Sequence, residues 1–155
     1  MIQRVQTIWL FLASLALFCL FLVPYLQIIK PDGTAQAIKV TGVYEQINNI
    51  PVKTQEFLGF TVLTVIVALL PLLVVFFYRD RKKQIVLSYL VIVAIIGLGF
   101  WLAQTAKGIV GDIKLDIPNY GIGVLLPSVA IIFMILALKG IRRDEKLIKS
   151  ADRLR

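Results

Sequence analysis

Side chains that could carry out chemistry are sparse in the long apolar stretches of this chain. The serine and threonine hydroxyls inside those stretches, away from their first residues, belong to Ser14, Thr61, Thr64, Ser88 and Ser128. A serine or threonine nucleophile needs a neighbouring base to take its proton. The apolar stretches contain no Asp, Glu or Lys, and the whole chain contains no histidine. We therefore predict no catalytic residues, and we expect the hydroxyls to bond to helix backbone or to a neighbouring helix.

Metal and redox chemistry are equally poorly supported. The chain has one cysteine and no histidine, so the usual ligands of zinc, haem and iron–sulfur centres are missing. Three acids outside the apolar stretches, Glu45, Asp112 and Asp116, could form a weak cation site, but Lys39 and Lys114 lie in the same segments. Surface ion pairs are the simpler interpretation, and we predict no metal and no cofactor.

The elements that carry these residues are predicted to be membrane helices. Apolar residues make up 59% of the chain and its mean hydropathy is +0.86, well above the roughly 45–50% apolar content of soluble domains. Crossing a bilayer takes about 20 apolar residues in a helix. Four uncharged stretches satisfy this requirement, at 7–29, 57–78, 85–103 and 122–138. We expect an all-α membrane protein of one domain, 1–155, with four transmembrane helices in an antiparallel bundle.

The charged residues predict how this bundle is oriented. Flanks 1–6, 79–84 and 139–155 hold twelve cations and four acids, whereas segments 30–56 and 104–121 hold five of each. The first group therefore carries the whole net charge of +8. Short flanks rich in Lys and Arg mark the cytoplasmic side. We expect a multi-pass protein of the bacterial inner membrane with both termini in the cytoplasm. Because orientation explains the cations, we predict no nucleic-acid partner.

The two outer connections, 30–56 and 104–121, contain alternating apolar and polar residues. Segments 35–44 and 113–117 show this pattern, which is typical of half-buried strands. One strand from each loop could pair into a small sheet that caps the bundle. An irregular loop on the headgroups explains the pattern equally well, and both alternatives stay open.

Two further features bear on function. The charged tail 139–155 has apolar residues at helical spacing, so we expect the fourth helix to continue into it. Its cations could contact anionic headgroups or a partner protein; they are Arg142, Arg143, Lys146, Lys149, Arg153 and Arg155. Prolines can kink membrane helices, and the candidates for such kinks are Pro24, Pro71 and Pro127.

The two ends of the chain resemble a known family. Residues 1–6, followed directly by an apolar stretch, and residues 140–155 resemble small four-helix inner-membrane proteins of Bacteroidota. That family is catalogued as a domain of unknown function. The resemblance implies a protein of this size and topology and implies no catalytic residues.

These observations predict a non-enzymatic membrane protein that serves as a structural or accessory subunit of a membrane assembly. Its partners would be the lipid bilayer, anionic headgroups at the cytoplasmic face and other membrane proteins. The alternative is a small transporter or a lipid-binding membrane protein that uses the helix kinks.

Overall fold

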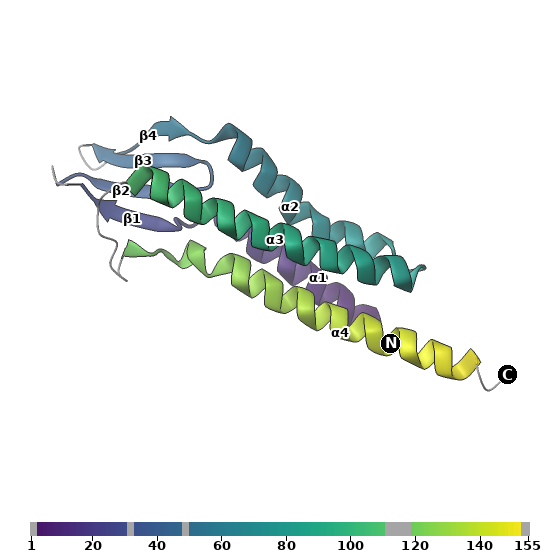
Figure 1. Cartoon of the computed structure of the whole chain (residues 1–155). Coiled ribbons are helices and arrows are strands. Elements are labelled where there is room, and N and C mark those ends of the chain that lie inside the picture. Colours follow the sequence, from purple (N-terminus) through teal and green to yellow (C-terminus); the bar gives the residue numbers. More distant parts are fainter. Residues whose placement is uncertain (1–2, 31–32, 48–49, 111–118, 153–155) are drawn as a thin grey trace.

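A computed structural model describes residues 3–30, 33–47, 50–110 and 119–152. Four helices pack side by side in this part of the chain: α1 (Gln3–Phe18), α2 (Leu58–Phe76), α3 (Arg81–Val110) and α4 (Leu126–Asp152). Helices α1 and α3 each pack against both α2 and α4. Successive helices run in opposite directions, so α1 begins and α4 ends at the pole opposite the sheet (Figure 1). We call this end the charged pole and the other end the sheet pole.

The helices pack through stripes of buried residues spaced alternately by four and three. In α1 the stripe is Gln6, Leu10, Ala13, Leu17 and Leu20, which continues into the short 3-10 helix η1 (Cys19–Phe21). Helix α3 repeats the pattern from Gln84 through Ser88, Val91, Ile95, Leu98 and Leu102. In α4 it runs through Pro127, Ala130, Met134, Ala137, Ile141 and Asp144. Spacings of three and four keep residues on one helix face, so each helix presents one continuous stripe to its neighbours.

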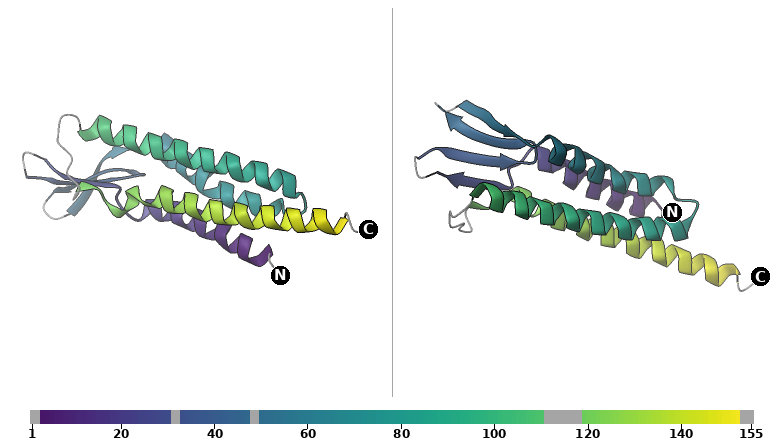
Figure 2. Two further views of the ribbon diagram at one scale, coloured as in Figure 1. Left: turned by 60° about the horizontal axis from the view of Figure 1, so that its bottom comes forward. Right: turned by 45° about the horizontal axis from the view of Figure 1, so that its top comes forward.

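The sheet pole carries a four-stranded antiparallel sheet in the order β1-β2-β3-β4. Its strands are β1 (Leu26–Ile29), β2 (Ala35–Lys39), β3 (Gly42–Ile47) and β4 (Ile50–Glu56). All four strands lie between α1 and α2 in the sequence, and they project beyond the ends of the helices (Figure 2). In this meander each strand pairs with its successor.

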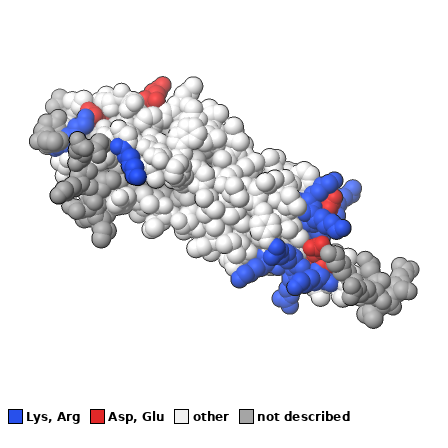
Figure 3. All heavy atoms as spheres, in the orientation of Figure 1, with Lys and Arg blue, Asp and Glu red and all other residues white. Residues whose placement is uncertain are grey.

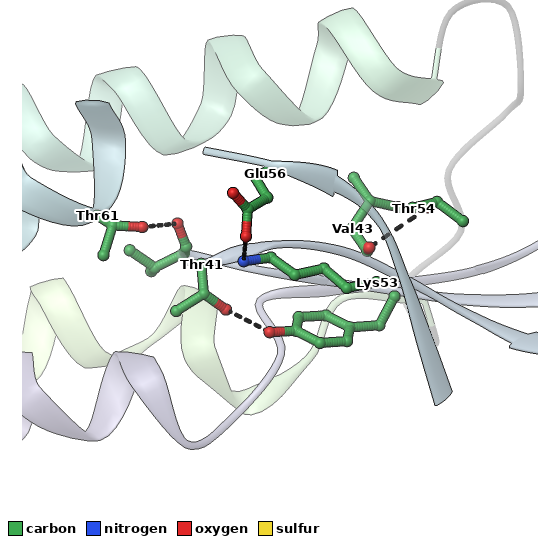
Figure 4. A network of polar contacts seen from close by, with 8 residues as sticks. Thr41, Val43, Lys53, Thr54, Glu56 and Thr61 are labelled. Carbon is green, nitrogen blue, oxygen red and sulfur yellow. Dashed lines mark hydrogen bonds and ion pairs between the residues drawn. The ribbon is translucent and has the colours of Figure 1, made fainter. Parts of the chain in front are cut away.

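A two-residue turn between β2 and β3 ties the sheet to the start of α2. Lys39 pairs with Gly42, and Gly42 has a φ of +150°. A Cβ atom there would lie 2.1 Å from the carbonyl oxygen of Gln55 in β4, so glycine permits the close approach of the strands. The hydroxyl of Thr61 donates to the carbonyl of Val40 at 3.2 Å, and the Phe57 amide donates to the carbonyl of Thr41 (Figure 4). The sheet is therefore anchored to α2 by backbone as well as by chain connection.

Side chains of β4 make two polar contacts. Within the strand, Lys53 forms an ion pair with Glu56 at 2.5 Å, and the Thr54 hydroxyl donates to the carbonyl of Val43 in β3 (Figure 4). The Lys53 ammonium lowers the pKa of the Glu56 carboxyl through a hydrogen bond. All seven residues of β4 are nonetheless exposed. These contacts secure the strand without burying it.

The expected all-α class is wrong. The four-stranded sheet is a substantial element, built from the first outer segment and the last four residues of the predicted span 7–29 rather than by pairing one strand from each loop. Residues 35–44 form a hairpin and not one strand, because the chain turns between Lys39 and Gly42. The predicted strand 113–117 lies outside the described residues. In the described part of the second outer segment, Tyr120 forms a β-bridge with Leu26 of β1.

The expectation of four membrane-spanning helices is also wrong. In the described chain, three helices are long and apolar enough to cross a membrane, namely α2, α3 and α4. Helix α1 has 16 residues, short of the roughly 20 that a span requires. The predicted span 7–29 fails because its last part becomes strand β1. Pro24 separates the two structures, and a helix usually ends before proline.

Charged residues on the surface lie at the two ends of the molecule, as expected for helices that cross a membrane. On the face shown in Figure 3, cations gather at the charged pole, a few charges lie at the sheet pole, and the wide band between them carries none. Large apolar side chains of that band are exposed, among them Ile66, Leu73, Val93 and Phe100. An apolar belt between two polar ends is the surface that a bilayer covers.

Candidate functional site

The buried stripes become polar as they reach the charged pole. Gln6 of α1 donates to Asp144 of α4 at 2.6 Å, and the Arg81 guanidinium of α3 donates to the same carboxylate oxygen at 3.1 Å. Gln6 and Asp144 are buried, and the Arg81 side chain is 14% exposed. Gly140 leaves room for Gln6, since a Cβ there would lie 2.8 Å from its Cγ. This polar layer therefore joins three helices through one carboxylate.

Gln84 extends the polar layer to the remaining helix. Its amide nitrogen donates to the carbonyl of Val74 near the end of α2. The Gln84 amide oxygen and the second oxygen of Asp144 are buried without a hydrogen-bond partner among the described residues. The polar layer thus contacts every helix and holds its members through charged and amide groups. Its arrangement suits fixing the helices together, because the carboxylate is already neutralised by Arg81.

The spacing of buried residues along α4 predicts that Asp144 is buried, although the charges around it suggest an exposed residue. Asp144 is one of the four acids in the charged flanks. It follows Ile141 by three, as Ala137 follows Met134, and so continues the buried stripe. Gln6 and Gln84 extend the stripes of α1 and α3 in the same way.

Helix α4 continues unbroken from its apolar part into the charged segment, as predicted. Arg142, Arg143 and Lys146 are exposed on it. The Arg142 guanidinium donates to the Tyr89 hydroxyl and stacks 5.2 Å from the centre of that ring. The side chains of Lys149, Arg153 and Arg155 lie outside those that the structure describes.

The three candidate prolines occupy different settings. Pro71 lies inside α2. Pro127 lies in the first turn of α4, where proline removes no helix hydrogen bond. Pro24 lies between η1 and β1, so it follows a helix instead of bending one.

Four of the five hydroxyls named in the apolar stretches bond to backbone, as expected. Ser14 donates to the carbonyl of Ala68 across helices at 2.7 Å. Thr64 and Ser88 donate to carbonyls four residues earlier, and Thr61 donates to the turn described above. The Ser14 bond thus joins α1 to α2, whereas the Thr64 and Ser88 bonds stay within their own helices.

The acids outside the helices do not assemble a metal site among the described residues. Glu45 forms an ion pair with Lys30, and Gln36 donates to the same carboxylate. Lys39 donates instead to the carbonyl of Leu22. Asp112, Lys114 and Asp116 lie outside the described residues. Glu45 is therefore paired, although with a different lysine from the one expected.

An apolar groove lies between α3 and α4 at the sheet pole. Its volume is about 340 Å³. Its walls come from α3, from the start of α4 and from the segment just before α4, and they include Ile95, Gly99, Leu102, Ala106, Val124 and Ile131. Its lining among the described residues contains no charged residue, and its polar side chains are Tyr25, Tyr120 and Ser128. The groove is thus an apolar cleft with a few hydroxyl groups.

Tyr25, the residue directly before β1, lines this groove. The residue is 1% exposed, and its hydroxyl has no hydrogen-bond partner among the described residues. Burial raises the pKa of the Tyr25 phenol, so the hydroxyl keeps its proton and can donate a hydrogen bond. Leaving such a group unpaired costs roughly 1–3 kcal/mol. Tyr25 lies within the predicted span 7–29, and nothing in the sequence indicates that it lines a groove. Its place there depends on the chain leaving the helix before β1.

Backbone hydrogen bonds from the segment before α4 hold the main chain at Pro24 and Tyr25 in place. The amides of Gly121 and Gly123 donate to the carbonyls of Tyr25 and Pro24, at 3.1 and 3.2 Å. A Cβ on Gly121 would lie 2.2 Å from the Pro24 oxygen. The glycines allow the segment before α4 to lie directly on the chain that leads into β1.

Comparison with known proteins places the whole chain in one family. No curated protein and no solved structure matches it. A family model described as a domain of unknown function, DUF4293, matches residues 2–154. This range includes the helices, the sheet, the polar layer and the groove, so all of them belong to one family domain. The chain is a member of the DUF4293 family.

Proposed function

We propose that this protein is a non-enzymatic integral protein of the bacterial inner membrane and an accessory subunit of a membrane assembly. Three helices of sufficient length and the uncharged belt around them support membrane insertion. The resemblance of its chain ends to inner-membrane proteins of Bacteroidota supports the compartment. The bonding of the helix hydroxyls to backbone argues against a catalytic role for them.

We place the charged pole on the cytoplasmic side and the sheet on the opposite side. The flanks of the charged pole carry the net charge of +8, and cytoplasmic flanks are rich in Lys and Arg. Helix α1 begins and α4 ends at this pole, so both termini are cytoplasmic in the proposal. Because α1 alone is shorter than a span, the chain reaches the sheet side in this proposal through α1, η1 and residues 22–25 together. A reporter active only outside the cytoplasm should be silent when fused to the C-terminus, and an active reporter would overturn this orientation.

The exposed edge of the sheet carries the accessory role. Among the described residues, strand β4 is paired on one side only, by β3, and every residue in it is exposed. Ile50 and Val52 are 63% and 41% exposed, next to Ile47 at 45%. An exposed strand edge with apolar side chains readily accepts a strand or a surface of another protein. We propose that β4 contacts a partner subunit.

Paired charge substitutions test this role. The double variant Ile50→Lys with Val52→Lys adds two cations to the apolar row and should reduce partner recovery several-fold in mild detergent. The control, Gln27→Lys with Gln46→Lys, adds the same charge at exposed positions of β1 and β3. Proteins recovered with the wild type and the control but depleted in the test variant support the proposal. Equal recovery in all three, with each variant still in the membrane fraction, contradicts it.

A lipid-binding role is the second candidate, and the groove between α3 and α4 favours it. The walls are apolar and the cleft is large enough for part of a small ligand or a lipid chain. Accessory and lipid-binding roles use different surfaces, so one chain can perform both.

A further inference from the structure

Tyr25 lines the groove, and its hydroxyl finds no hydrogen-bond acceptor among the described residues. The hydroxyl is buried and keeps its proton. Buried polar groups in folded proteins almost always have a partner. An occupant of the groove that brings an acceptor oxygen to Tyr25 would supply one.

The position of the groove selects the class of occupant. It lies between α3 and α4, two of the helices long enough to cross a membrane. Ile96, Val124 and Ser128 of its lining are exposed, so it opens to the side of the helices. Tyr120 of its lining and nearby Trp101 are each 50% exposed, and such aromatic residues mark the headgroup level of a bilayer. A lipid can therefore enter the groove without leaving the membrane.

We propose that the groove binds one acyl chain of a membrane phospholipid, with its ester carbonyl accepting a hydrogen bond from the Tyr25 hydroxyl. Ester carbonyls lie at the boundary between headgroups and chains, which is the level that the aromatic residues mark. The apolar wall along α3 extends from Ile95 to Ala106. These eleven residue steps span about 16 Å. The chain lies along this wall toward the centre of the bilayer.

Two glycines of α3 provide a matched pair of variants. Gly99 lines the groove, whereas Gly97 is exposed and absent from the lining. A Cβ at either position meets nothing within 4 Å, so both positions accept a side chain. Gly99→Leu should fill the groove, and Gly97→Leu should leave it open. The probe is a phosphatidylcholine with a photoreactive group on one acyl chain, and the protein is reconstituted in bilayers of ester-linked lipid.

We expect Gly99→Leu to reduce labelling of groove residues at least fivefold, with labelling of Gly97→Leu equal to that of the wild type. Equal labelling in all three proteins would show ordinary boundary lipid and overturn the proposal. Circular dichroism confirms that each variant is folded.

Removing the hydroxyl tests the hydrogen bond itself. Competition between ester-linked and ether-linked phospholipids of the same chain length isolates the carbonyl, because the ether lipid lacks it. We expect the wild type to prefer the ester lipid by roughly five- to tenfold, as one hydrogen bond allows. Tyr25→Phe should lose that preference while still binding both lipids. A preference unchanged in Tyr25→Phe would contradict the role of Tyr25.

This inference rests on the proposed membrane insertion and is independent of the partner at β4. A protein extracted from membranes by alkaline carbonate would overturn the insertion and the inference together. A protein that stays inserted but labels equally in all variants overturns the inference alone.

Discussion

The two poles of this molecule differ in whether their buried polar side chains join helices to one another. At the charged pole, Asp144 accepts hydrogen bonds from Gln6 and Arg81 and so joins three helices. At the sheet pole, the Tyr25 hydroxyl is equally buried but bonds to nothing among the described residues. The charged pole also carries a dense surface of cations, whereas the sheet pole carries few charges (Figure 3).

This difference separates a site that holds the fold from a site that can accept a ligand. The polar layer at the charged pole joins three helices through Asp144, although one oxygen of Asp144 and one of Gln84 have no partner among the described residues. Such a charge-paired network favours one arrangement of the helices. An unsatisfied donor in an apolar cleft lowers the free energy of any occupant that brings an acceptor. Substitutions at the charged pole should therefore change stability, and those in the groove should change binding.

The largest effect is expected from Asp144→Ala. Removing the carboxylate leaves Arg81 and Gln6 mostly buried without their acceptor, and breaking a buried ion pair in this way costs about 3–5 kcal/mol. Thermal unfolding in detergent would show a much lower midpoint. The control is Arg143→Ala, one residue away and exposed, which should change stability by less than about 0.5 kcal/mol. Equal midpoints for the two variants would show that the polar layer does not hold the helices.

At the sheet pole, Gly121→Ala should destabilise the contact between β1 and the segment before α4. Its Cβ would lie 2.2 Å from the Pro24 oxygen, so the backbone must shift. Overpacking of this kind costs roughly 1–3 kcal/mol. The control Gly108→Ala lies in open space on α3, and alanine there favours the helix by up to about 1 kcal/mol. Hydrogen exchange of β1 amides measures the difference, and unchanged protection in Gly121→Ala would contradict the expectation.

Charge reversal in the tail tests the contact with anionic headgroups. Arg143→Glu with Lys146→Glu should weaken retention of phosphatidylglycerol in nanodiscs by about 1 kcal/mol per cation removed. Lys107→Glu makes the same kind of change near the sheet pole and should have a smaller effect per charge, because it removes a cation from a sparse region. Equal effects per charge at the two poles would remove this part of the contrast.

The smallest effect is expected at Asp80, which precedes α3. Its carboxylate accepts a hydrogen bond from the Lys83 amide, and this bond, together with the Lys83 side chain, lowers the pKa of Asp80. A carboxyl with a lowered pKa stabilises the fold above its unfolded pKa and loses that contribution as pH falls through the folded pKa. The midpoint of Asp80→Asn should therefore lie slightly below that of the wild type at pH 7. The two should converge in acid; a constant difference would show that ionisation is not involved.

Helix positions could be predicted from the sequence because the bilayer requires long apolar segments. Stretches 57–78 and 85–103 correspond to α2 and to the centre of α3, as periodic hydrophobicity predicts. The first helix was overestimated because residues 26–29 are as apolar as the helix before them. Their strand conformation depends on pairing with β2, whose partner residues follow six to twelve positions later in the chain.

The site residues divide in the same way. The burial of Asp144 could be found from the spacing of three and four along α4, which is local information. The role of Tyr25 could not, because the groove forms only when residues 24–25, α3 and the start of α4 meet. The exposed edge at β4 likewise depends on strand order, which hydropathy does not specify.

Helix α4 links the two poles in a single rod. It is continuous from Leu126 to Asp152, 27 residues or about 40 Å. Pro127 and Ser128 at one end line the groove, and Asp144 lies near the other end. A rotation of this rod about its axis would carry groove wall and carboxylate through the same angle. Any such rotation would therefore change the wall of the groove and the hydrogen bonds of Asp144 together.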